Sequence, residues 1–152
     1  MIELKKNFSY LCEVSRILAI DYGLKRTGLA VTDPEQIIAT ALTTVRTHDL
    51  MPFLKDYLLK EKVECIVVGD PRTLSNKPSE ISPQVEAFVK RLKEAFPGIS
   101  LERMDERFTS KIAQQSMLLD GMKKTDRQNK ELVDQRSAVL ILQSFMEKIK
   151  GR

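Results

Sequence analysis

The chain has 152 residues, 42% of them apolar and 30% charged, and its mean hydropathy is -0.25. These values fit one globular domain and exclude a disordered chain, a collagen or a solenoid. No stretch approaches the ~20 apolar residues that a transmembrane helix needs, so we expect a cytoplasmic protein with no membrane association. Lys and Arg number 25 against 21 Asp and Glu, a net charge of +4, which permits nucleic-acid binding without requiring it.

Short apolar and β-branched runs predict three strands in the first third of the chain. They cover Arg16–Ile20, which stops at Asp21, then Thr27–Thr32 and Ile37–Val45. A glycine-containing turn separates the first two runs. The short connections favour antiparallel pairing.

Helical and strand patterns alternate in the rest of the chain. The elements predicted there are a helix over Leu50–Leu58, a strand over Glu64–Gly69, a helix over Ser82–Phe96, a strand over Ile99–Met104, a helix over Thr109–Gly121, a polar connection over Met122–Leu132 and a helix over Val133–Lys150. Strands joined by helices form parallel neighbours, so the prediction is an α/β fold with a mixed sheet and helices packed on it.

The cysteines and the single histidine point to no catalytic chemistry. Cys65 lies in the apolar run Cys65–Val68, which favours a buried, reduced thiol over a disulfide with Cys12. His48 precedes the first helix and is interpreted as a turn residue, because a lone histidine offers neither a catalytic partner nor a zinc shell.

Three acidic residues stand at positions where α/β proteins build sites. Asp21 closes the first strand, Glu106 follows the strand that ends at Met104, and Asp134 lies near the start of the last helix on the side that faces the sheet. Each also has a structural explanation. Asp134 could complement the helix dipole, Asp21 could cap a turn, and Glu106 could pair with a neighbouring arginine.

Together the three carboxylates favour a metal site. Two carboxylates at ~4 Å repel by about 4 kcal/mol at an effective dielectric constant of about 20, so a fold that gathers three needs a counter-cation. Oxygen ligands from strand ends and a helix start suit Mg²⁺ or Mn²⁺. The pattern therefore favours metal-assisted hydrolysis of phosphodiester bonds, with Lys25, Arg26, Arg107 and Arg136 as candidate contacts to substrate phosphates.

Four motifs resemble the YqgF family, also called RuvX, over nearly the whole chain. They are Ile20–Val31 (IDYGLKRTGLAV), Val67–Pro71 (VVGDP), Asp105–Ser110 (DERFTS) and Val133–Val139 (VDQRSAV). The resemblance implies an RNase H-like domain over residues 16–150, after an N-terminal extension over residues 1–15. It also implies a five-stranded sheet whose first three strands are antiparallel.

The same resemblance implies a catalytic triad of Asp21, Glu106 and Asp134. Asp21 would bridge two metal ions, and Glu106 and Asp134 would each hold one. The implied substrate is the 5′ end of precursor 16S ribosomal RNA, with the ribosome or its precursor as a partner, or alternatively a Holliday junction. Structured RNA and branched DNA both stay open here.

Two other function classes also stay open. A noncatalytic RNA-binding factor for ribosome assembly would bind RNA with a steep salt dependence and without cleavage. A phosphate-binding ATPase of the actin and sugar-kinase superfold fits less well, because such proteins need two lobes. The oligomeric state is open between monomer and homodimer, since a resolvase that cuts two strands acts by two-fold symmetry.

Overall fold

The computed structural model describes residues 15–70, 82–105 and 129–151. Their elements in chain order are β1 (Arg16–Asp21), β2 (Arg26–Thr32), β3 (Ala39–Arg46), a 3₁₀ turn η1 (Thr47–Asp49), α2 (Leu50–Lys60), β4 (Val63–Asp70), α3 (Ser82–Ala95), β5 (Ser100–Asp105) and α6 (Lys130–Lys150). The helix predicted over Thr109–Gly121 lies outside the described residues.

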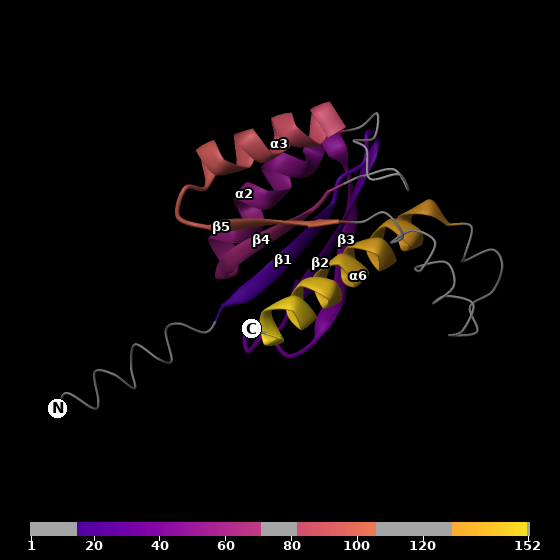
Figure 1. The fold of residues 1–152 in the computed structure, drawn as a ribbon. Coiled ribbons are helices and arrows are strands. Elements are labelled where there is room, and N and C mark those ends of the chain that lie inside the picture. The colour runs from indigo at the N-terminus through magenta and orange to yellow at the C-terminus, as the bar shows by residue number, and fades with distance from the viewer. Residues whose placement is uncertain (1–14, 71–81, 106–128, 152) are drawn as a thin grey trace.

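The strands form one five-stranded sheet in the order β3-β2-β1-β4-β5 (Figure 1). β1 pairs antiparallel with β2, and β2 pairs antiparallel with β3. β4 lies parallel to β1 and β5 lies parallel to β4. The predicted mixed sheet with three antiparallel first strands is confirmed. Its three parallel strands all end at the same edge of the sheet.

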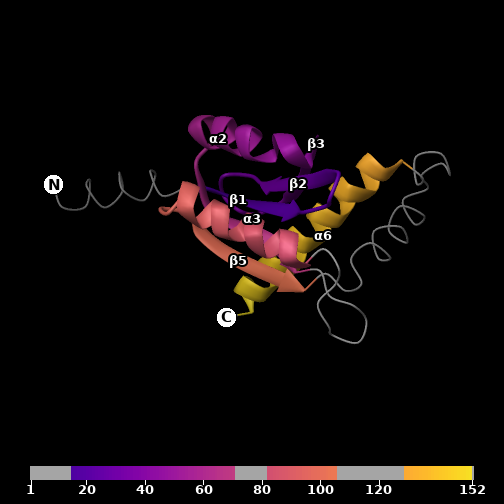
Figure 2. The ribbon, with the colours of Figure 1, turned by 90° about the horizontal axis from the view of Figure 1, so that it is seen from above.

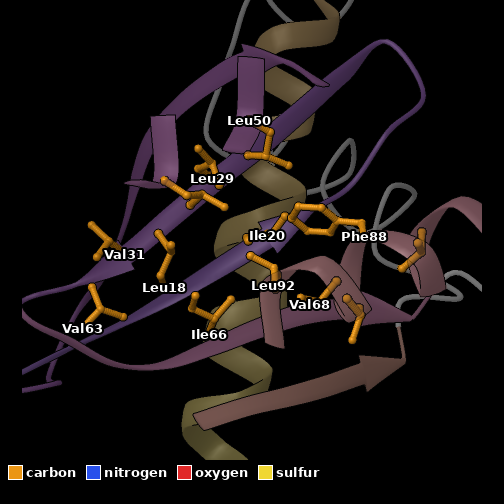
Figure 3. Packing of buried hydrophobic residues seen from close by; sticks show 13 residues of the cluster. Leu18, Ile20, Leu29, Val31, Leu50, Val63, Ile66, Val68, Phe88 and Leu92 are labelled. Carbon is orange, nitrogen blue, oxygen red and sulfur yellow. The ribbon is translucent and has the colours of Figure 1, made fainter. Parts of the chain in front are cut away.

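Helices cover both faces of the sheet, with α2 and α3 on one face and α6 on the other (Figures 1 and 2). Side chains alternate along the central strand β1 accordingly. Leu18 and Ile20 pack in the core beneath α2 and α3, which Figure 3 shows, while Ile17 and Ala19 pack beneath α6. The apolar run of β1 is therefore buried on both sides.

Strand β3 begins two residues later than predicted. Ile37 and Ile38 are exposed, and their N–H groups both donate to Asp33 Oδ1 at 2.7 Å. Gln36 has a φ of 59°, which is left-handed backbone. These residues thus belong to the turn between β2 and β3, and the assignment of Ile37 and Ile38 to a strand is wrong.

Helix α6 begins three residues earlier than predicted. Asn129 caps it by accepting a hydrogen bond from Glu131 N at 3.0 Å, and Lys130 is the first helical residue. The interpretation of residues up to Leu132 as a polar connection is therefore wrong for Lys130–Leu132. Ala138, Ile141 and Phe145 of α6 are buried, as expected for the side of this helix that faces the sheet.

Other sequence predictions agree with the structure. Cys65 is a free, buried thiol, and burial raises the pKa of that thiol to about 11, which makes it unreactive at neutral pH. His48 lies exposed in η1, as expected for a turn residue. Cys12 lies outside the described residues. None of the helices in the described part of the chain is long and apolar enough to span a membrane.

Candidate nuclease site

Asp21 is the last residue of β1, at the sheet edge where the parallel strands end. It lies two residues beyond Ala19, which packs beneath α6, so strand alternation places Asp21 on the same face. The residue after it, Tyr22, belongs to the opposite face and stacks on Phe88 of α3 with ring centroids 4.9 Å apart. This aromatic contact anchors the chain directly after Asp21.

Gly28 brings the backbone of α6 onto the sheet beside Asp21. It is the Cα partner of Asp21 in the β1–β2 ladder. A Cβ atom on Gly28 would lie 2.1 Å from the carbonyl oxygen of Asp134, closer than any real contact. The helix rests on the strand only because that side chain is missing, and the backbone of Asp134 therefore lies against the ladder partner of Asp21.

Arg26, the first residue of β2, binds the Asp134 carboxylate. The Nε–H of Arg26 donates to Asp134 Oδ2 at 3.3 Å, and the side chains are 34% and 26% exposed. Burial raises the pKa of the Asp134 carboxyl, while the hydrogen bond and the charge of Arg26 lower it in part. The structure thus holds a half-buried carboxylate that a cation would stabilise.

The helix-dipole explanation for Asp134 does not apply. Because α6 begins at Lys130, Asp134 is the fifth helical residue and lies beyond the first turn, where the dipole acts. Glu131 holds the first-turn acidic position and Asn129 holds the cap. Asp134 is therefore placed by the contact of the helix with the sheet.

A third acidic side chain at this edge, Asp70, is directed to the other face. Asp70 ends β4 and accepts a hydrogen bond from Arg103 at 3.4 Å, and Arg103 also donates to Glu86 of α3 at 2.8 Å. Along β4, Val67 packs beneath α6 and Val68 packs beneath α2 and α3. Asp70 is two residues beyond Val68, so strand alternation places it on the face that α2 and α3 cover. Asp70 is thus part of an ion-pair network that fixes α3.

The remaining predicted site residues have different outcomes. Lys25 is exposed in the turn between β1 and β2, next to Arg26. Arg136 lies on α6, but its spacing of two residues from Asp134 puts it on another side of the helix. Glu106 and Arg107, which follow β5, lie outside the described residues, so their places stay predictions.

The donor chemistry of this edge suits a hard divalent cation. Asp21 and Asp134 offer carboxylate oxygens, the ligand type that Mg²⁺ and Mn²⁺ prefer. Among the described residues no group of three or more His, Cys, Asp or Glu side chains lies close enough to hold a metal ion. The sequence prediction assigns the third carboxylate to Glu106, which lies outside the described residues.

Sequence reasoning missed the part that Gly28 plays. A glycine inside the otherwise apolar strand Arg26–Thr32 is a signal of close backbone approach, and this signal was available. The pairing of Arg26 with Asp134 was not available, because it depends on where α6 crosses β2.

Comparison with known proteins places the chain in a family. The family model described as "RuvX: Holliday junction resolvase" matches residues 15–148. A protein of Phocaeicola vulgatus named "Putative pre-16S rRNA nuclease" is 56% identical over 134 residues, which cover 88% of this chain and 96% of that protein. A protein of the same name from Bacteroides thetaiotaomicron is 53% identical over 134 residues, covering 88% and 97%.

A solved structure supports the fold alone. The structure titled "T. thermophilus RuvC in complex with Holliday junction substrate" has a TM-score of 0.54 and 16% sequence identity. The match covers 89% of this chain and 96% of that chain. The RNase H-like architecture expected from the motifs is thereby confirmed.

Proposed function

Since the chain belongs to the RuvX family, we propose that it is a divalent-metal-dependent nuclease that processes the 5′ end of precursor 16S ribosomal RNA. The observation that carries this proposal is the position of the Asp134 backbone against Gly28, the ladder partner of Asp21, at the edge where the parallel strands end. The names of the relatives favour precursor rRNA as the substrate. Such a substrate implies work in the cytoplasm on the ribosome precursor.

The site residues have distinct proposed roles. Asp21 and Asp134, with Glu106 as the third ligand, hold Mg²⁺ or Mn²⁺, and the cation supplies polarisation of the scissile phosphate and activation of water. Arg26 orients the Asp134 carboxylate through its Nε–H bond, and its charge partly offsets the rise in pKa that burial causes. The Tyr22–Phe88 stack holds the loop that presents Lys25 to substrate phosphates.

The test compares cleavage of a precursor 16S rRNA fragment by the wild type and by Asp21→Asn, Glu106→Gln and Asp134→Asn. Each variant keeps a side chain of similar shape and loses one ligand charge, so we expect the cleavage rate to fall by about a hundredfold or more. Chelation of divalent ions should abolish cleavage. Asp56→Asn is the matched control, because Asp56 is exposed on α2, on the opposite face, and pairs with Lys60 of the same helix.

Two outcomes would contradict the proposal. Cleavage by Asp21→Asn at the wild-type rate would remove the carboxylate site. Tight RNA binding without cleavage under any divalent metal would instead identify a noncatalytic assembly factor.

A Holliday junction is the second candidate substrate, because the matching family is described by that activity. Cutting two strands symmetrically requires a two-fold dimer, whereas trimming one RNA strand does not. Cleavage of a four-way DNA junction by a dimer, with no effect on the rRNA fragment, would favour this alternative.

A further inference from the structure

A recess of about 560 Å³ opens beside the carboxylate edge. We call it the β2–β3 recess, and its described lining residues are Leu24, Lys25, Arg26, Thr44, Val45, Arg46, His48 and Glu131. They come from the turn after β1, the paired ends of β2 and β3, η1 and the first turn of α6. A recess of this size can admit one nucleotide.

The recess shares a wall with the proposed catalytic site. Arg26 lines it and also binds Asp134. Arg46 is the Cα partner of Arg26 in the β2–β3 ladder, so its backbone lies one strand further from the carboxylates. A strand of nucleic acid that passes Asp134 and crosses β2 towards β3 therefore meets Arg46 next.

Two cations in the recess have no counter-ion in the described part of the chain. Lys25 and Arg46 are exposed, and no described carboxylate forms a salt bridge with either of them. The other basic groups are engaged, Arg26 with Asp134 and His48 with Asp49 at 3.5 Å. Lys25 and Arg46 are thus available for a phosphate group.

Hydrogen bonds hold the walls of the recess in place. The Thr44 hydroxyl donates to the carbonyl oxygen of Glu131 at 2.8 Å, which ties β3 to α6. Thr47 binds the turn after β1 twice, through its N–H to Lys25 O at 3.0 Å and through its hydroxyl to Gly23 O at 2.6 Å. The cations therefore stand on a preorganised frame, which lowers the cost of binding.

We propose that the β2–β3 recess binds the nucleotide next to the scissile bond, with its backbone phosphate on Lys25 and Arg46. This inference rests on the proposed nuclease function and adds the path of the substrate strand. Leu24, which is 64% exposed, and Val45 supply apolar contact for the sugar or base. Glu131 is the one carboxylate among the described lining residues, and its charge repels a phosphate that lies close to it.

The test measures binding in the Asp21→Asn background, so that cleavage plays no part. The probe is a short fluorescein-labelled single-stranded RNA, with a DNA strand of the same sequence as a second arm. Arg46→Ala should weaken binding about tenfold and reduce the slope of log K against log salt by about 0.7, the value for one phosphate contact on a single strand. Arg46→Lys should restore the slope, because it restores the charge.

Glu131→Gln provides a change of opposite sign within the same recess. Removal of its charge should tighten binding about twofold to fivefold, which damage to the fold cannot do. Arg91→Ala is the matched control for lost charge, because Arg91 is exposed on α3, which covers the other face. It should leave both the affinity and the slope unchanged.

Unchanged affinity and slope in Arg46→Ala, or an equal loss in Arg91→Ala, would overturn the assignment of the recess. Neither result depends on cleavage, so a failure of the recess assignment is distinguishable from a failure of the nuclease proposal. Equal effects on RNA and DNA would place the contact on the phosphate shared by both. An effect confined to one of them would show which nucleic acid the recess accepts.

Discussion

Gly28 determines how close α6 comes to the sheet. A Cβ atom on Gly28 would lie 2.1 Å from the carbonyl oxygen of Asp134 and 2.4 Å from its carbonyl carbon, and both atoms belong to the backbone. Backbone atoms cannot rotate away as a flexible side chain can. Any side chain at residue 28 must therefore push the helix, and Asp134 with it, away from Asp21.

Gly28→Ala tests this contact. The variant should lose roughly 1 to 3 kcal/mol of unfolding free energy through overpacking. The folded fraction of the variant should also cleave RNA more slowly than the wild type, because Asp134 is displaced. Urea unfolding and RNA cleavage measure the two effects. Gly98→Ala is the control, since a Cβ atom there meets nothing within 4 Å. Wild-type activity in a folded Gly28→Ala protein would contradict the close approach.

The Asp134 carboxyl is costly to keep ionised in the metal-free protein. Burial raises its pKa above the ordinary value, and Arg26 offsets this only in part. A raised pKa in the folded state means that the folded chain holds the proton more tightly than the unfolded chain. The stability contributed by this group therefore falls as the pH rises through the pKa in the folded state, and it stays lower at neutral pH.

Asp134→Asn should remove that pH dependence. In the presence of a chelator we expect the variant to be at least as stable as the wild type at neutral pH, with the advantage vanishing in acid. Mn²⁺ at about 100 times its Kd should add about 2.7 kcal/mol to the wild type and much less to the variant. Thermal unfolding across pH, with and without Mn²⁺, measures both. Equal stabilisation of the two proteins by Mn²⁺ would exclude Asp134 as a ligand.

At the scale of elements, the first turn of α6 positions the site. Asn129 caps it through Glu131 N, and Thr44 of β3 binds Glu131 O. Asp134 follows one turn later, so its place depends on a helix end that is fastened at both backbone groups of Glu131.

Asn129→Ala should loosen this turn. Loss of the cap should cost about 1 kcal/mol of unfolding free energy, and fraying of the turn should reduce cleavage. Asn129→Asp keeps an acceptor at the cap and should retain both properties. Chemical denaturation and cleavage rates for the two variants check the expectation. Equal behaviour of Asn129→Ala and Asn129→Asp would show that the cap does not support the site.

The two boundaries that the sequence prediction missed have physical reasons. The periodicity of apolar residues begins at Val133, but capping by Asn129 extends the helix over the polar residues before it. Ile37 and Ile38 have strand propensity, yet the Asp33 carboxylate binds their N–H groups and forms a turn. An Asn before an acidic first turn and an Asp–Pro pair were the available signals.

At the scale of the whole molecule, the antiparallel and parallel parts of the sheet follow from connection lengths. Short loops join β1 to β2 and β2 to β3, whereas α2 lies between β3 and β4 and α3 lies between β4 and β5. The placement of Asp21 at a strand end was equally readable. The pairing of Arg26 with Asp134 was not, because it joins segments far apart in sequence. The alignment of Arg46 with Arg26 was not readable either, because a register shift interrupts the β2–β3 ladder.

The net charge of +4 does not locate a nucleic-acid site, and the proposed site rests instead on the arrangement of particular residues in the fold. The fold brings the backbone of Asp134 against the ladder partner of Asp21, and it places Lys25 and Arg46, which have no counter-ion among the described residues, in the β2–β3 recess beside them. If the carboxylates hold cations, this edge attracts phosphate where the metal-free protein repels it.

The central claim is that Asp21 and Asp134 share a divalent cation. Anomalous diffraction from crystals of the full chain soaked in Mn²⁺ tests it most directly. We expect a peak within coordinating distance of both carboxylates, with Glu106 as a further ligand. Mn²⁺ bound only elsewhere, or in contact with neither aspartate, would contradict the claim.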